Sequence, residues 1–150
     1  MSDSHDDIQQ QITDYVCALD FDALPKHVVE AARLRIMDTL GALVAGYHDD
    51  VARRSRELAA LMPVATGATV LGTSMKTTPD VAAFANANAA RSVDYTDTYH
   101  WPGAFGGRPG DVVLPVFAAS EFAHADGRRF ITAVVVAYEV FSRISDVFHN

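Results

Sequence analysis

The chain has 150 residues, 49% of them apolar, and a formal net charge of −7. It is long enough for one core and too short for two substantial domains, and its acidic balance argues against a nucleic-acid partner. A single cysteine, Cys17, excludes an internal disulfide and a multi-cysteine metal site, and it favours a reducing, cytoplasmic setting. The N-terminus is acidic rather than signal-like, and no apolar run approaches ~20 residues without a charge, so we expect no membrane partner.

Apolar residues recur at spacings of three and four along most of the chain, which is the pattern of amphipathic helices. The sequence therefore predicts an all-α fold, a helical bundle of about five to six helices. Pro25 and Pro79 suit the first turns of two of them, and Thr78 is the expected N-cap of the helix that Pro79 opens. In chain order the helices are expected at residues 8–19, 25–47, 50–62, 79–91, 111–125 and 128–148.

The same pattern predicts how these helices pack. The many alanines after Pro79 indicate tight packing against another helix. Gly41 and Gly46 in the second helix indicate close approach of a neighbour or, for Gly46, fraying at the helix end. The last helix is apolar almost all round, which predicts a central place in the bundle and further polypeptide to cover it. Residues 68–71 are expected to form a short extended piece.

Titratable, hydroxyl and glycine residues crowd between the fourth and fifth helices. Asp94 and Asp97 lie three positions apart and precede Thr98, and a glycine-rich run at residues 103–110 carries Arg108. Loops held by a rigid scaffold are frequent binding sites. The glycines are not a dinucleotide fingerprint, because no strand–helix unit surrounds them, and no phosphate-loop, zinc-protease or nucleophile-elbow motif is present.

The residue types in this loop leave three interpretations open. In the first, aspartate and threonine side chains satisfy local backbone amides in turns and caps. In the second, Asp94, Asp97 and His100 bind a hard metal ion, although their spacing fits no standard loop. In the third, threonine hydroxyls, glycine amides and the Arg108 guanidinium form a pocket for a small polyanion.

Four stretches, in this order, resemble the N-terminal part of the MmgE/PrpD family. They are DTLGALVAG at residues 38–46, ANAARSVDYTDT at 87–98, PGDVVLP at 109–115 and AYEVFSRI at 137–144. The resemblance implies that residues 1–150 are part of the all-helical domain of that family, with its smaller α/β lid domain absent. It also implies a cofactor-independent, metal-free enzyme that is usually a homodimer. The family's lyases, such as 2-methylcitrate dehydratase, and its epimerases remove or move a proton next to a carboxylate of a small polycarboxylate substrate.

The resemblance carries functional residues over to matching positions. Asp94 matches the family's first active-site aspartate and Thr98 its threonine, so these two are the expected catalytic residues. An aspartate can hold or relay a proton, and a threonine hydroxyl can steady a substrate carboxylate. The expected substrate-binding residues are Arg108, Asp97, His100 and Gly110.

Two departures from the family pattern leave two functions open. Arg108 stands where the family commonly has a histidine before Pro-Gly, and arginine cannot act as an acid or base at neutral pH, although it can clamp a carboxylate. The chain also stops near His149, before the family's downstream lysine and tyrosine. The first hypothesis is an N-terminal portion or split subunit of a polycarboxylate lyase or epimerase, completed by a C-terminal polypeptide. The alternative is a non-catalytic helical remnant or interaction module that assembles with a full-length relative.

Overall fold

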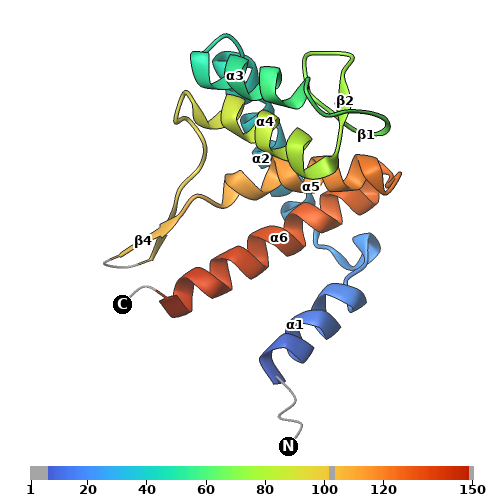
Figure 1. Cartoon of the computed structure of the whole chain (residues 1–150). Helices are drawn as coiled ribbons and strands as arrows, with labels where there is room; N and C mark the ends of the chain where they lie inside the picture. The colour runs from blue at the N-terminus through green and yellow to red at the C-terminus, as the bar shows by residue number, and fades with distance from the viewer. Residues whose placement is uncertain (1–6, 102–103, 149–150) are drawn as a thin grey trace, which may run out of the picture.

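A computed structural model describes residues 7–101 and 104–148 of the chain (Figure 1). Within these residues the fold is predominantly helical, which confirms the predicted all-α class. Two short 3₁₀ turns, η1 (Phe21–Ala23) and η2 (Pro109–Val112), precede α2 and α5. The α-helices are α1 (Asp7–Ala18), α2 (Lys26–Gly46), α3 (Asp50–Ala59), α4 (Pro79–Arg91), α5 (Val113–Phe122) and α6 (Gly127–Phe148).

Helix α4 is the centre of the fold, and it packs against α2, α3 and α5 (Figure 1). Small side chains make this possible, because they let several helix backbones approach one axis closely. Its four fully buried alanines confirm the tight packing predicted from sequence; they are Ala82, Ala85, Ala89 and Ala90. Thr78 is the N-cap residue and Pro79 opens the helix, as predicted, although the Thr78 side chain makes no capping hydrogen bond to a backbone amide.

Gly46 marks the closest approach of α2 to α4. A Cβ atom on Gly46 would overlap the carbonyl oxygen of Ala89 and the hydroxyl of Ser92. The prediction of close helix contact is therefore confirmed at Gly46. It is wrong at Gly41, where a Cβ atom would have no neighbour within 4 Å, because Gly41 lies on the exposed face of α2.

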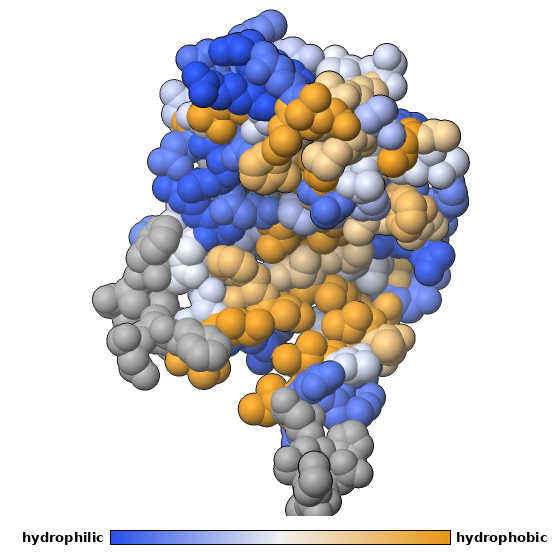
Figure 2. Space-filling view, in the orientation of Figure 1, coloured by the Kyte–Doolittle hydropathy of each residue, from blue (hydrophilic) through white to orange (hydrophobic). Residues whose placement is uncertain are grey.

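The prediction that the last helix is central in the bundle is wrong for the structure described. Helix α6 packs on α2 and α5 along one side, where Val134 is 1% exposed, and most of its other side chains are half-exposed or exposed. Charged residues such as Glu139 and Arg143 interrupt its apolar surface, so the helix has a polar side. Figure 2 shows hydrophobic side chains gathered along α6 on the face in view.

Two further boundaries differ from the prediction. The extended piece expected at residues 68–71 overlaps only the last two residues of a strand that begins earlier, β1 (Pro63–Thr69), which pairs antiparallel with β2 (Lys76–Thr77). Pairing with β2 together with packing against α5 stabilises this short strand. Helix α3 consequently ends at Ala59 rather than at residue 62, since Pro63 already belongs to β1.

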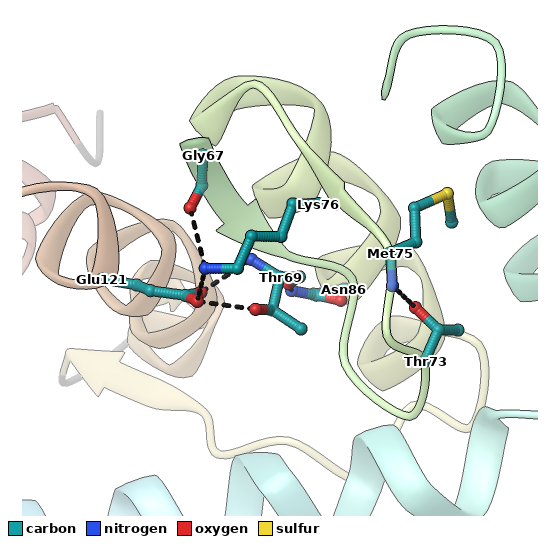
Figure 3. A network of polar contacts seen from close by, with 7 residues as sticks. All are labelled: Gly67, Thr69, Thr73, Met75, Lys76, Asn86 and Glu121. Carbon is teal, nitrogen blue, oxygen red and sulfur yellow. Dashed lines mark hydrogen bonds and ion pairs between the residues drawn. The ribbon is translucent and has the colours of Figure 1, made fainter. Parts of the chain in front are cut away.

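A polar network joins the β1–β2 hairpin to the helices (Figure 3). The Glu121 carboxylate on α5 accepts hydrogen bonds from the Thr69 amide and hydroxyl, both at 2.6 Å, and pairs with Lys76 Nζ at 3.1 Å. From α4, the Asn86 side-chain amide donates to the Thr69 carbonyl at 3.0 Å and accepts from the Leu71 amide at 2.9 Å. Asn86 therefore fixes the hairpin to α4.

The N-terminal helix α1 contributes no buried residue to the core. The turn that follows it is tied to α6, where the Arg128 guanidinium lies 4.5 Å from the centre of the Phe21 ring and pairs with Asp22. No helix in the described residues has the length and apolar composition needed to cross a membrane.

Gly46→Ala tests the α2–α4 contact. The new Cβ atom meets a backbone carbonyl, so the helices must separate, and we expect a loss of about 1–3 kcal/mol in the free energy of unfolding. Gly41→Ala is the matched control on the same helix, with an expected gain of up to about 1 kcal/mol from helix propensity. Urea denaturation of both variants measures the difference, and equal stabilities would contradict the packing described.

Glu121→Gln tests the polar network. Burial by itself raises the pKa of Glu121, but the hydrogen bonds from Thr69 and the contact with Lys76 outweigh it and hold the pKa below its ordinary value. A carboxyl group with a lowered folded pKa adds stability above its unfolded pKa, and that stability is lost as the pH falls through the folded pKa.

At pH 7 we therefore expect Glu121→Gln to cost about 1–3 kcal/mol of unfolding free energy, with the cost shrinking in acid. The control is Glu57→Gln, which removes an exposed ion pair with Arg53 and should change stability by less than about 1 kcal/mol. A cost at Glu121 that does not depend on pH would contradict the role of its ionised form.

Candidate functional site

The candidate site lies in the segment that connects α4 to η2. The glycine-rich loop predicted there contains a two-stranded hairpin, β3 (Tyr99–Trp101) and β4 (Ala104–Gly107), which sequence reasoning missed. The hairpin lies beside the C-terminal part of α6 (Figure 1). The Tyr99 hydroxyl donates to Asp146 on that helix at 2.6 Å, and this hydrogen bond raises the pKa of Tyr99. Gly107 has a φ of +110°, and a Cβ atom there would lie 2.8 Å from the Phe141 ring.

Asp94 is held by two arginines at the start of this segment. The Arg108 guanidinium contacts both carboxylate oxygens of Asp94, at 2.6 Å and 3.2 Å, in the two-pronged geometry that arginine forms with carboxylates. Arg91, at the end of α4, adds a contact at 3.1 Å. Asp94 has a φ of 56°, a left-handed conformation that aspartate tolerates better than most residues. Its side chain is 61% exposed, so the carboxylate faces solvent.

Asp111 contacts the same arginine, Arg91, as Asp94 does. Its carboxylate is 3.5 Å from Arg91 Nε, whereas Asp94 is bound by Nη1 of the same guanidinium. Burial raises the pKa of Asp111 above its ordinary value, and the positive charges of Arg91 and Arg108 oppose that rise.

Asp97 is enclosed by protein groups. Its side chain is 9% exposed; Oδ1 accepts the Gly110 amide hydrogen at 2.7 Å, and Oδ2 accepts the Tyr138 hydroxyl hydrogen at 3.1 Å. Arg35 Nε on α2 lies 3.6 Å from Oδ2. A Cβ atom at Gly110 would lie 2.5 Å from Asp97 Oδ1, so glycine is the residue that leaves room for this carboxylate. The structure thus brings Asp97 and Gly110 into contact with each other.

Thr98 and His100 are both exposed residues of the same segment. Thr98 follows Asp97 directly and is exposed, and its hydroxyl makes no hydrogen bond within the described part of the chain. His100 is exposed on β3, opposite Phe105 of β4. No group of three or more histidine, cysteine, aspartate or glutamate side chains in residues 7–101 and 104–148 is arranged to hold a metal ion. Asp94, Asp97 and His100 therefore do not form the ligand set of the metal-ion interpretation.

Sequence reasoning selected Asp94 and Arg108 and missed the groups that hold them. Arg91 and Asp111 are close in space because the end of α4 and the start of η2 converge, which no local pattern reveals. Tyr138 is 41 positions from Asp97. The sequence signals for it are its place in the AYEVFSRI stretch at residues 137–144 and its polar tip within an otherwise apolar run of the last helix.

The arrangement suits the binding of small anions with several carboxylates. Arg91 and Arg108 are partly exposed guanidinium donors, and the carboxylate that both now contact is that of Asp94. A bound carboxylate would compete with Asp94 for Arg108 and leave Asp94 available to accept a proton. The Thr98 hydroxyl lies four residues along the same segment and can donate a further hydrogen bond.

Comparison with protein families matches residues 10–150 to the MmgE/PrpD N-terminal domain. The match covers the whole of the candidate site, from Arg91 through Tyr138. Comparison with solved structures finds no match.

Proposed function

The chain belongs to the MmgE/PrpD family through the N-terminal domain at residues 10–150, and from this premise we propose that it supplies part of a polycarboxylate-processing active site. The proposed activity is that of a cofactor-independent lyase, similar to 2-methylcitrate dehydratase, or of an epimerase. The observation that carries the proposal is the pairing of Asp94 with Arg108, an acid–base group held on a carboxylate-binding group.

The proposed roles follow from the chemistry of a hydrogen on the carbon next to a carboxylate. Arg108 binds one substrate carboxylate with two parallel hydrogen bonds, which fixes the substrate against Asp94. Asp94, released from Arg108, accepts the proton from that carbon. The Thr98 hydroxyl steadies a second carboxylate. The electron pair left on carbon then expels hydroxide from the adjacent carbon, as water after protonation, or takes a proton on its other face.

Arg108 replaces the family's common histidine, and this shapes the proposal. A guanidinium stays protonated at neutral pH and therefore binds and orients but does not transfer a proton. Asp111, whose pKa burial raises, is the neighbouring group suited to carry one. We propose that the acid role of that histidine falls to Asp111 or to a residue outside the described part of the chain.

The alternative function, an interaction module, has support from another face of the molecule. An apolar groove of about 540 Å³ runs between α1 and the C-terminal half of α6. Its apolar lining residues are Ile8, Ile12, Tyr15, Val140, Ile144 and Val147. Apolar side chains gathered at a groove are typical of surfaces that bind another polypeptide, and the proposed partners are a second copy of the chain, a full-length relative or a complementary C-terminal polypeptide.

Arg108→Lys tests the carboxylate clamp. Lysine keeps the charge but loses the two-pronged geometry, so we expect the dissociation constant for citrate, a tricarboxylate probe, to rise about tenfold or more in titration calorimetry. The matched control is Arg33→Lys. Arg33 forms an exposed ion pair with Glu30 on α2, away from the site, and this variant should bind citrate as the wild type does. Equal citrate affinity in Arg108→Lys and Arg33→Lys would remove the clamp from the proposal.

Asp94→Asn tests the proton acceptor. The amide keeps the shape of the carboxylate but cannot take up a proton, so we expect loss of at least about a hundredfold in turnover. Turnover is measured on the chain reconstituted with a complementary C-terminal polypeptide, by proton nuclear magnetic resonance in D₂O, as uptake of deuterium or loss of water by a panel of hydroxylated di- and tricarboxylates. Full activity in the reconstituted Asp94→Asn variant would rule out its catalytic role, and a reconstituted wild type that neither binds nor exchanges any of these acids favours the interaction module.

A further inference from the structure

The Asp97 carboxylate joins four separate parts of the chain. It belongs to the segment after α4, and its three contacts come from Gly110 in η2, Tyr138 on α6 and Arg35 on α2. Each oxygen has a partner, and the side chain is 9% exposed. A carboxylate in these surroundings binds protein rather than ligand, because a ligand would have to displace hydrogen bonds that are already made.

Of these partners, Tyr138 is the one that donates a hydrogen bond to Asp97 from a helix side chain. Its hydroxyl donates to Asp97 Oδ2 at 3.1 Å. Burial raises the pKa of Tyr138, as does the negative charge of Asp97, with a smaller effect from Asp38 and an opposing one from Arg35. The phenol therefore stays protonated at neutral pH and remains a donor to Asp97.

Asp97 lies within the short stretch that carries the proposed catalytic residues. Thr98 is its immediate neighbour, and Asp94 precedes it by three residues with a left-handed φ of 56°. Between them, Thr96 is 7% exposed and accepts a hydrogen bond from Arg91 at 3.5 Å. The contacts of Asp97 and Thr96 are on the buried side of this backbone, whereas Asp94 and Thr98 lie on its exposed side.

We propose that Tyr138 is a positioning residue for the candidate site, and that it acts through Asp97 to hold the backbone carrying Asp94 and Thr98 in place. This inference rests on the proposed function for the roles of Asp94 and Thr98. It assigns Asp97 and Gly110 to the support of the site rather than to contact with substrate. In this proposal, helix α6 supports the polycarboxylate site through Tyr138.

Tyr138→Phe tests the inference without changing the charge or the apolar volume of α6. Losing a hydrogen bond to a buried carboxylate should raise amide hydrogen exchange about tenfold in residues 94–99 and at Gly110, while exchange in α4 stays unchanged. In the same protein we expect the dissociation constant for citrate to rise about fivefold or more. Both are measured on the full chain, in the absence and presence of citrate.

Tyr47→Phe is the matched control. The Tyr47 hydroxyl donates to the Gly72 carbonyl at 3.1 Å, far along the chain from the site, so this variant also loses one tyrosine hydrogen bond. We expect it to leave both exchange at residues 94–99 and citrate affinity as in the wild type. An equal effect of the two variants on citrate affinity would show a general loss of stability rather than positioning.

The outcomes separate the inference from the function on which it rests. Wild-type exchange at residues 94–99 in Tyr138→Phe overturns the inference, and so does faster exchange there with wild-type citrate affinity. If the wild type itself binds no polycarboxylate, the proposed function fails. The exchange comparison in the absence of citrate still decides whether Tyr138 orders the segment.

Discussion

Close packing around the alanine face of α4 is the constraint on which the rest of this structure depends. Four buried alanines allow α2, α3 and α5 to meet one helix, and Gly46 lets the backbone of α2 reach the last turn of α4. Because that contact fixes the end of α4, it also fixes Arg91, from which the candidate site is built. The hairpin β1–β2 packs against the same helix and is joined to it by Asn86 and to α5 by Glu121.

The buried carboxylate of Asp97 connects the helices to the candidate site. Asp97 would be costly to enclose without partners, and it has hydrogen bonds from Gly110 and Tyr138 at its two oxygens. Those bonds bring α6 and the start of η2 to the segment that follows α4. Asp94, in contrast, is exposed and bound by arginines at the surface, where an incoming carboxylate can exchange with it. The proposed site thus has a buried side held by the hydrogen bonds of Asp97 and an exposed side where a ligand can compete with Asp94 for Arg108.

The sequence was informative where a local pattern carries the structure. Helical spacing, the alanines of α4, and Pro79 behind Thr78 identified the helices, and four motifs identified the family. It was uninformative where the outcome depends on long-range contacts. The apolar run of α6 does not say how many of its sides are covered, and the glycines after His100 do not distinguish a loop from a hairpin. Asp94 and Arg108 were selected by residue type and by comparison with the family pattern, but Arg91, Asp111 and Tyr138 join the site only through the meeting of α4, η2 and α6.

The most direct measurement of this account is a crystal structure of the protein with citrate bound. The account predicts a citrate carboxylate on the Arg108 guanidinium, with Asp94 displaced from it and facing the ligand, and with Thr98 near a second carboxylate. Asp97 should keep its hydrogen bonds to Gly110 and Tyr138. Citrate bound away from Arg108, or Asp97 turned out of its contacts toward the ligand, would contradict the account.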